Sequence, residues 1–202
     1  YVDEIKGTLT ADSLSRQGFS NENVDMITSF IDSMYERLKT EGDLNIYLVL
    51  THGDFCPANM LNTKQGLRVI DWESATDRSA LFDYYSYFFF RPLHQELSVA
   101  TTASEIEITL SSVLSELDLI APEISENVRA HENVYRWLFY IERIVMLVDR
   151  EKHDTKLDIM GSILRYIELF NCYEEQCLKT MQKRTVKSKN LKTVSAKAGG
   201  YE

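Results

Sequence analysis

Apolar residues recur at helical spacing along much of the chain, and the longest early run lies between Ser20 and Gly42. One face repeats every three or four residues over about four turns. It contains Val24, Ile27, Phe30, Ile31, Met34, Tyr35 and Leu38. Ser20 can cap the start of this helix and Gly42 can end it. The preceding residues 1–20 have only weak periodicity, so we expect them to be mostly loop.

The next segment predicts strands. Ile46–Leu50 is a short apolar run that leads into the polar stretch from Thr51 to Glu73. Within that stretch, Asn59–Asn62 and Leu67–Ile70 flank a turn of the sequence Lys-Gln-Gly. This strand–turn–strand pattern predicts a β-hairpin.

Helical spacing returns after Glu73 and continues toward the C-terminus. Residues 74–92 indicate a turn and then a helix that ends at Pro92. Three more helices are expected at Ser104–Leu119, Glu126–Asp149 and Leu157–Met181. The second of these, residues 126–149, has the widest apolar face and should be central to the fold. The pattern predicts a mainly α fold with a small β-hairpin.

The predicted hairpin brings chemically useful oxygen atoms together. Pro57 prevents a regular helix between Asp54 and Asn59, so that loop is bent. The second hairpin strand ends at Asp71, which must return to the start of the first. Two carboxylates and one amide oxygen would then surround one small volume. Such ligands suit Mg²⁺ bound with substrate phosphates, and a carboxylate not engaged by the metal can act as a general base.

The two motifs around these residues, HGDFCPAN and VIDWE, resemble the aminoglycoside phosphotransferase and choline kinase-like family. That family has the protein-kinase-like fold, and its helical C-terminal lobe carries the catalytic loop. The resemblance implies that Asp54 is the catalytic base and that Asn59 and Asp71 hold Mg²⁺. ATP is the implied phosphoryl donor, with GTP possible. A loop-stabilising Asp, a turn Asn and a strand-end Asp are the structural alternatives for the three positions.

Three further residues are expected to support this site. His52 should hold the loop by bonding the backbone. Glu73 either supports a ligand of the metal, binds a second metal or has no role. The resemblance implies that Asp83 supports the catalytic loop from behind, whereas the alternative is an acid favoured by a helix N-terminus. Cys56 occupies a loop position where the family often has His. The sequence identifies no His partner for its thiol, so it does not support Cys56 as a nucleophile.

The resemblance implies a phosphotransferase whose acceptor, a hydroxyl of an amino sugar, sugar or amino alcohol, binds in a cleft of the helical lobe. Acids bind amines, and aromatic faces bind quaternary ammonium groups. Glu132, Trp137, Tyr140 and Glu142 lie on one predicted helix and are candidates for lining it. The alternative is that the same aromatic stripe belongs to the core.

The resemblance covers only a C-terminal lobe. Only 51 residues precede His52, and the sequence has no glycine-rich phosphate motif. We therefore expect an N-terminal segment (1–20), a kinase-like lobe (21–181) with catalytic loop 51–60 and metal-binding segment 67–73, and a tail (182–202). A nucleotide-binding lobe would be a missing partner, and the chain alone would have little or no turnover. A non-catalytic kinase-like binding or scaffold module is the alternative function.

Charge and composition narrow the partners. The net charge is −9, although seven basic residues and one acid follow Leu178. The acidic body argues against nucleic acid and suits a cationic small molecule, whereas the basic tail is expected to be disordered. Three cysteines without C-x-x-C spacing favour neither disulfides nor zinc. The acidic start does not resemble a signal peptide, and no apolar run reaches transmembrane length. A cytoplasmic protein is expected.

Overall fold

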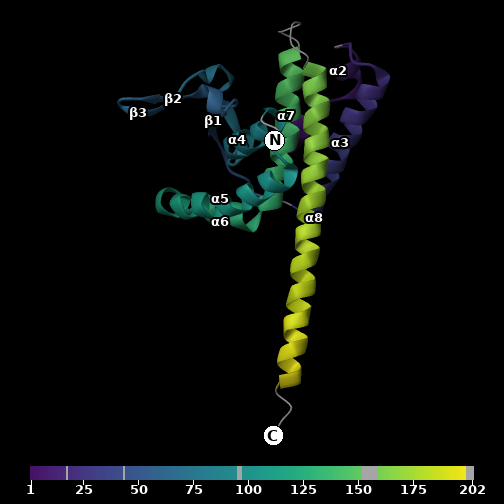
Figure 1. The fold of residues 1–202 in the computed structure, drawn as a ribbon. Helices are drawn as coiled ribbons and strands as arrows, with labels where there is room; N and C mark the ends of the chain where they lie inside the picture. The colour runs from purple at the N-terminus through teal and green to yellow at the C-terminus, as the bar shows by residue number, and fades with distance from the viewer. Residues whose placement is uncertain (17, 43, 95–96, 152–158, 199–202) are drawn as a thin grey trace.

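The computed structural model describes residues 1–16, 18–42, 44–94, 97–151 and 159–198. It is mainly helical with two small antiparallel sheets, which confirms the predicted fold class (Figure 1). The helices are α1 (Val2–Thr8), α2 (Ala11–Arg16), α3 (Asn21–Thr40), α4 (Phe82–His94), α5 (Val99–Ile120), α6 (Pro122–Ala130), α7 (Glu132–Glu151) and α8 (Ile159–Ala198). The strands are β1 (Leu48–Thr51), β2 (Met60–Thr63), β3 (Gly66–Val69) and β4 (Thr76–Ser79).

The N-terminal segment is helical where the sequence led us to expect mostly loop. Helices α1 and α2 are each too short to show a clear apolar repeat. Their stability comes from packing, because α1 contacts α3 and α7, and α2 contacts α3. Leu9 and Leu14 are the buried anchors of this segment.

Helix α3 forms as its sequence pattern predicts. The Ser20 hydroxyl accepts a hydrogen bond from the Asn23 backbone N–H and so caps the first turn. The apolar face is buried against α7 and α8. α3 therefore covers one side of the helical core.

The loop after β1 connects the two sheets. β2 and β3 form the predicted hairpin, with Thr63 opposite Gly66. β1 pairs with β4, with Thr51 opposite Thr76. The sequence pattern missed β4, because Thr-Asp-Arg-Ser contains no apolar alternation. The chain therefore leaves β1, forms the loop and hairpin, and returns beside β1 through β4.

Several helix boundaries differ from the expected ones. α4 continues two residues past Pro92, although proline has no N–H to bond the preceding turn. α5 begins at Val99, where the Ser98 hydroxyl accepts from the Thr101 N–H. The helix expected at residues 126–149 is divided at His131 into α6 and α7, and their apolar faces have different main partners, α5 for α6 and α8 for α7.

Helix α8 extends well beyond the other helices and strands (Figure 1). It continues through residues 182–198, where the composition led us to expect a disordered tail. This stretch has no Gly or Pro and is rich in Lys, a good helix former. Residues 199–202 of the expected tail lie outside the described residues.

Aromatic rings from α4, α7 and α8 fill the core. Phe89, Phe139 and Phe170 come from the three helices and contact one another, with ring centroids 5.3–5.7 Å apart. Tyr140 stacks on Phe170 at 4.1 Å. α7 is central, as expected. Of the helices in the described parts of the chain, none is long and apolar enough to cross a membrane.

Candidate active site

The loop after β1 requires glycine at position 53. Gly53 has a φ of +83°, which L side chains rarely adopt. A Cβ there would lie 2.4 Å from the Ser74 carbonyl oxygen and 2.8 Å from Nη1 of Arg78. The loop is therefore pressed against the segment that follows the hairpin, which fixes its path.

Asp83 holds this loop from behind. Its two carboxylate oxygens accept from the backbone N–H groups of His52, at 2.6 Å, and Gly53, at 3.0 Å. Asp83 lies in the first turn of α4, so the helix positions the carboxylate. Charge-assisted bonds of this kind are the strong ones. The contact is the geometry that a supporting role requires.

His52 links the two halves of the site through its ring. Nδ1 accepts from the Asp54 N–H at 3.2 Å, and the other ring nitrogen, Nε2, lies 2.7 Å from the carbonyl oxygen of Ile70. Together these contacts fit the tautomer with its proton on Nε2, which then donates to Ile70. The ring is buried and lies 4.8 Å from that of Trp72. His52 thereby connects Asp54 to the residue just before Asp71.

Asn59 is oriented by Asp54. Its side-chain nitrogen donates to the Asp54 carbonyl oxygen at 2.8 Å and lies 3.4 Å from the Asp54 carboxylate. The amide oxygen remains the atom suited to a cation. The Asn59 carbonyl accepts from the Ile70 N–H at 3.0 Å, so the hairpin returns the chain as predicted.

Asp71 and Glu73 follow the hairpin, and both are exposed. Asp71 is exposed and has a φ of 66° and a ψ of 59°, in the left-handed region. Glu73 is exposed in the short 3₁₀ helix Trp72–Ser74. Within the described ranges, no three His, Cys, Asp or Glu side chains group closely enough to hold a metal. The expected metal ligands are one amide oxygen, from Asn59, and one carboxylate, from Asp71, so they do not form such a group.

Two arginines near the loop were not anticipated. Arg78 donates to the Thr51 hydroxyl at 2.8 Å and to the Ser74 carbonyl at 3.2 Å, and burial lowers its pKa. Arg143, on α7, donates to the Gly53 carbonyl at 3.3 Å. The only sequence signal for Arg143 is a charged residue within the apolar helix expected to be most buried.

The four expected acceptor-binding residues do not come together. Trp137 and Tyr140 are buried and donate to the Glu174 carboxylate, at 3.3 and 3.0 Å. Glu142 is buried and accepts from the backbone and hydroxyl of Ser79. Three of these side chains therefore belong to the interior, because the helix that carries them is packed on several sides. The alternative, a core stripe, describes Trp137 and Tyr140.

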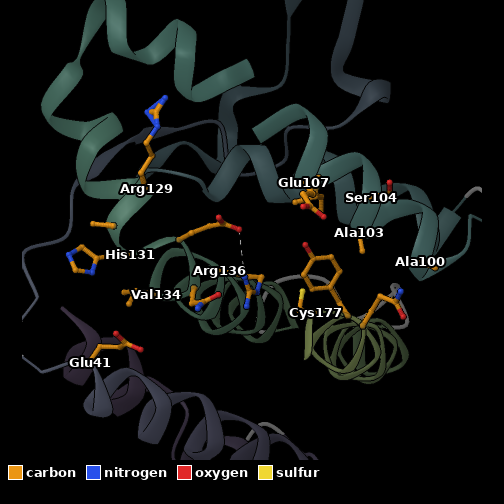
Figure 2. Close-up of a pocket in the computed structure, with 16 residues that line it drawn as sticks. Glu41, Ala100, Ala103, Ser104, Glu107, Arg129, His131, Val134, Arg136 and Cys177 are labelled. Atoms are coloured by element: carbon orange, nitrogen blue, oxygen red, sulfur yellow. Dashed lines mark ion pairs between the residues drawn. The ribbon is translucent and has the colours of Figure 1, made fainter. Parts of the chain in front are cut away.

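Glu132, the fourth, lines a groove of about 560 Å³ between α5, α7 and α8 (Figure 2). Figure 2 shows Arg136 beside Cys177 in this groove. Among the described residues, neither Asp54 nor Asn59 nor Asp71 lines it. The groove is thus separate from the loop site.

Comparison with known proteins agrees with the motifs. The profile of the phosphotransferase enzyme family (APH) matches residues 27–108, which include the loop, the hairpin and α4. No curated protein and no solved structure matches the chain significantly. The resemblance seen in the two motifs is thereby confirmed, and residues 27–108 match the phosphotransferase enzyme family, consistent with an aminoglycoside phosphotransferase or kinase-like protein.

Proposed function

We propose that this chain forms the catalytic lobe of an ATP- and Mg²⁺-dependent phosphotransferase that acts on a hydroxyl of a small molecule. An amino sugar, a sugar or an amino alcohol is the acceptor class, and GTP is an alternative donor. A separate nucleotide-binding lobe would hold the nucleotide over the loop. A cytoplasmic location, where ATP is abundant, completes the proposal.

One observation carries the proposal: the ring of His52 joins Asp54 to the end of the hairpin strand that precedes Asp71. Its two nitrogens contact the Asp54 N–H and the Ile70 carbonyl. The base and both metal-ligand segments are consequently fixed relative to one another. A loop that only joined two strands would not need this internal bonding.

In this function Asp54 accepts the proton of the acceptor hydroxyl and aligns its oxygen with the γ-phosphorus. The oxygen–phosphorus bond forms as the bond to the leaving nucleoside diphosphate breaks. Asn59 and Asp71 would hold Mg²⁺, which neutralises charge on the phosphates when bound. Most of the rate gain would come from positioning the reactants. The rigidity of the loop therefore matters as much as the basicity of Asp54.

The test measures phosphoryl transfer from ATP to a panel of amino sugars, sugars and amino alcohols, using the full-length protein with Mg²⁺. Asp54→Asn should lower kcat by about 10²–10⁴-fold. Asp71→Asn should raise the Mg²⁺ concentration required for half-maximal rate. Asp77→Asn is the matched control, because Asp77 is an exposed acid on β4.

An unchanged rate in Asp54→Asn would refute the base assignment. Absence of transfer from the wild-type protein across all acceptor classes would instead favour the non-catalytic alternative. Substantial turnover by this chain without a nucleotide-binding lobe would refute the lobe assignment.

A further inference from the structure

Arg143 is a buried cation with partners in the catalytic loop and on α8. It is 7% exposed and comes from the middle of α7. Its Nη1 donates to the Gly53 carbonyl at 3.3 Å, and its Nη2 lies 3.9 Å from Oδ1 of Asp54. A buried charge is costly unless it is closely paired. Here the nearby carboxylate is the proposed base, at a distance longer than a hydrogen bond.

The guanidinium is held in place by α8. Nη2 donates to the Tyr166 hydroxyl at 2.9 Å, and the cation lies over the Tyr166 ring, 4.9 Å from its centroid. Tyr166 is itself buried. Nε of Arg143 has no hydrogen-bond partner among the described residues. This arrangement fixes the plane of the guanidinium but does not give it the full set of bonds that a purely stabilising arginine would make.

The loop is therefore clamped on two sides. Asp83 holds the N–H groups of His52 and Gly53, and Arg143 holds the Gly53 carbonyl and faces the Asp54 carboxylate. Gly53 is thus held through both its N–H and its carbonyl, and the carbonyl belongs to the Gly53–Asp54 peptide. A displacement of that peptide by a fraction of an ångström would move the Asp54 carboxylate away from the acceptor hydroxyl.

We propose that Arg143, oriented by Tyr166, is a positioning residue that sets the place of Asp54 in the catalytic loop. Its catalytic meaning rests on the proposed function, whereas its effect on the loop does not. The packing of α8 would thus reach the base through two side chains, Tyr166 and Arg143, in addition to the hold of Asp83 from α4.

The test uses four variants: Arg143→Met, Arg143→Lys, Tyr166→Phe and the control Arg165→Met, an exposed arginine next to Tyr166. Two quantities are measured. Amide hydrogen exchange of residues 51–60 reports loop order, and steady-state kinetics of the full-length protein report kcat and KM for ATP. Thermal unfolding first confirms that each variant is folded.

Arg143→Met should speed exchange in the loop by about tenfold or more. It should lower kcat by about 10–100-fold with KM for ATP nearly unchanged. Arg143→Lys should recover part of kcat because it keeps the charge, and Tyr166→Phe should show the same pattern more weakly. Arg165→Met should match the wild type. A purely structural role would not lower kcat while leaving KM unchanged. Nor would Arg143→Lys then recover part of kcat.

Equal loop exchange and kcat in folded Arg143→Met and wild type would overturn the inference. If Arg143→Met does not fold, Tyr166→Phe decides in the same way. Faster exchange together with no transfer by the wild type would overturn the proposed function while supporting the hold of Arg143 on the loop. Faster exchange with an unchanged kcat in an active enzyme would overturn the positioning role alone.

Discussion

Helix α7 carries two buried arginines seven residues apart, and their surroundings differ. Arg136 donates to the Glu174 carboxylate at 2.7 Å, and the same carboxylate accepts from Arg37 at 2.7 Å. Arg143 faces a carboxylate at 3.9 Å and leaves Nε without a partner in the described parts of the chain. The first arginine joins α7 to α8, and the second reaches the loop.

The two arginines differ in what they contribute: Arg136 stabilises the fold, whereas Arg143 is proposed to position the loop. Glu174 accepts four hydrogen bonds from side chains on α3 and α7, so this end of the helix is a closed network. Seven residues further along α7, Arg143 is partly unsatisfied beside the loop that contains Asp54. Incomplete bonding of a buried polar atom is costly, so it tends to persist where the surrounding geometry serves another purpose.

The largest effect is expected at the closed end. Glu174→Ala leaves Arg136 buried at 4% exposure without its close partner, and this should cost about 3–5 kcal/mol of unfolding free energy. Urea unfolding measures the loss. Glu175→Ala is the control, because its ion pair with Lys179 is exposed and should be worth less than about 1 kcal/mol. Equal losses would remove the distinction between the two kinds of pair.

The next effect is expected at the loop. Gly53→Ala combines a left-handed backbone with a Cβ 2.4 Å from the Ser74 carbonyl oxygen, so the loop must move. Gly66→Ala is the matched control, since Gly66 has a φ of +108° but no atom within 4 Å of the added Cβ. We expect Gly66→Ala to cost about 1–2 kcal/mol from backbone strain and Gly53→Ala to cost more. Thermal unfolding compares the two, and a smaller loss in Gly53→Ala would contradict the close packing.

The smallest effect is a pH dependence of opposite sign at two buried glutamates. Burial raises the pKa of Glu142 despite hydrogen bonds from Ser79 and Tyr1. Burial acts most strongly and would raise the pKa of Glu174, but the charge of Arg136 and the hydrogen bonds from Arg136, Trp137 and Tyr140 together outweigh it, and that pKa is lowered. Glu174 therefore contributes stability above its unfolded-state pKa, and this contribution is lost as pH falls through the folded-state value. The Glu142 contribution is largest below its unfolded-state pKa and is lost as pH rises through the folded-state value.

Unfolding free energies of the wild type, Glu174→Gln and Glu142→Gln, measured between about pH 3 and 8, test these signs. The deficit of Glu174→Gln relative to the wild type should shrink toward acid pH. The difference for Glu142→Gln should shift in favour of the variant as pH rises. Parallel profiles for both variants would contradict the opposite shifts.

The sequence predicted those parts of the fold that depend on residues close together in the chain. The Ser20 cap and the turn at residues 64–66 identified α3 and the hairpin, and the spacing of Asp54 and Asn59 identified the loop. Asp83 was anticipated through the resemblance, and its carboxylate does contact the loop backbone.

The remainder depended on contacts distant in sequence. β4 is polar and becomes a strand only because β1 lies beside it. Arg143 meets Gly53 across 90 positions of sequence, and nothing local marks which of the charges on α7 faces the loop. Trp137 and Tyr140 were expected among the acceptor-binding residues for the same reason, because helical spacing does not show which neighbouring helix covers a face.

The left-handed backbone at Asp71 restricts the choice of residue before any metal is considered. With φ at 66°, Gly, Asn and Asp are accommodated most readily. A library of all amino acids at this position, sorted only for folded protein, should therefore retain those three. Sorting the same library for phosphoryl transfer should retain Asp alone. The gap between the two surviving sets would measure how much of the identity of this residue is due to its carboxylate and how much to the shape of the chain.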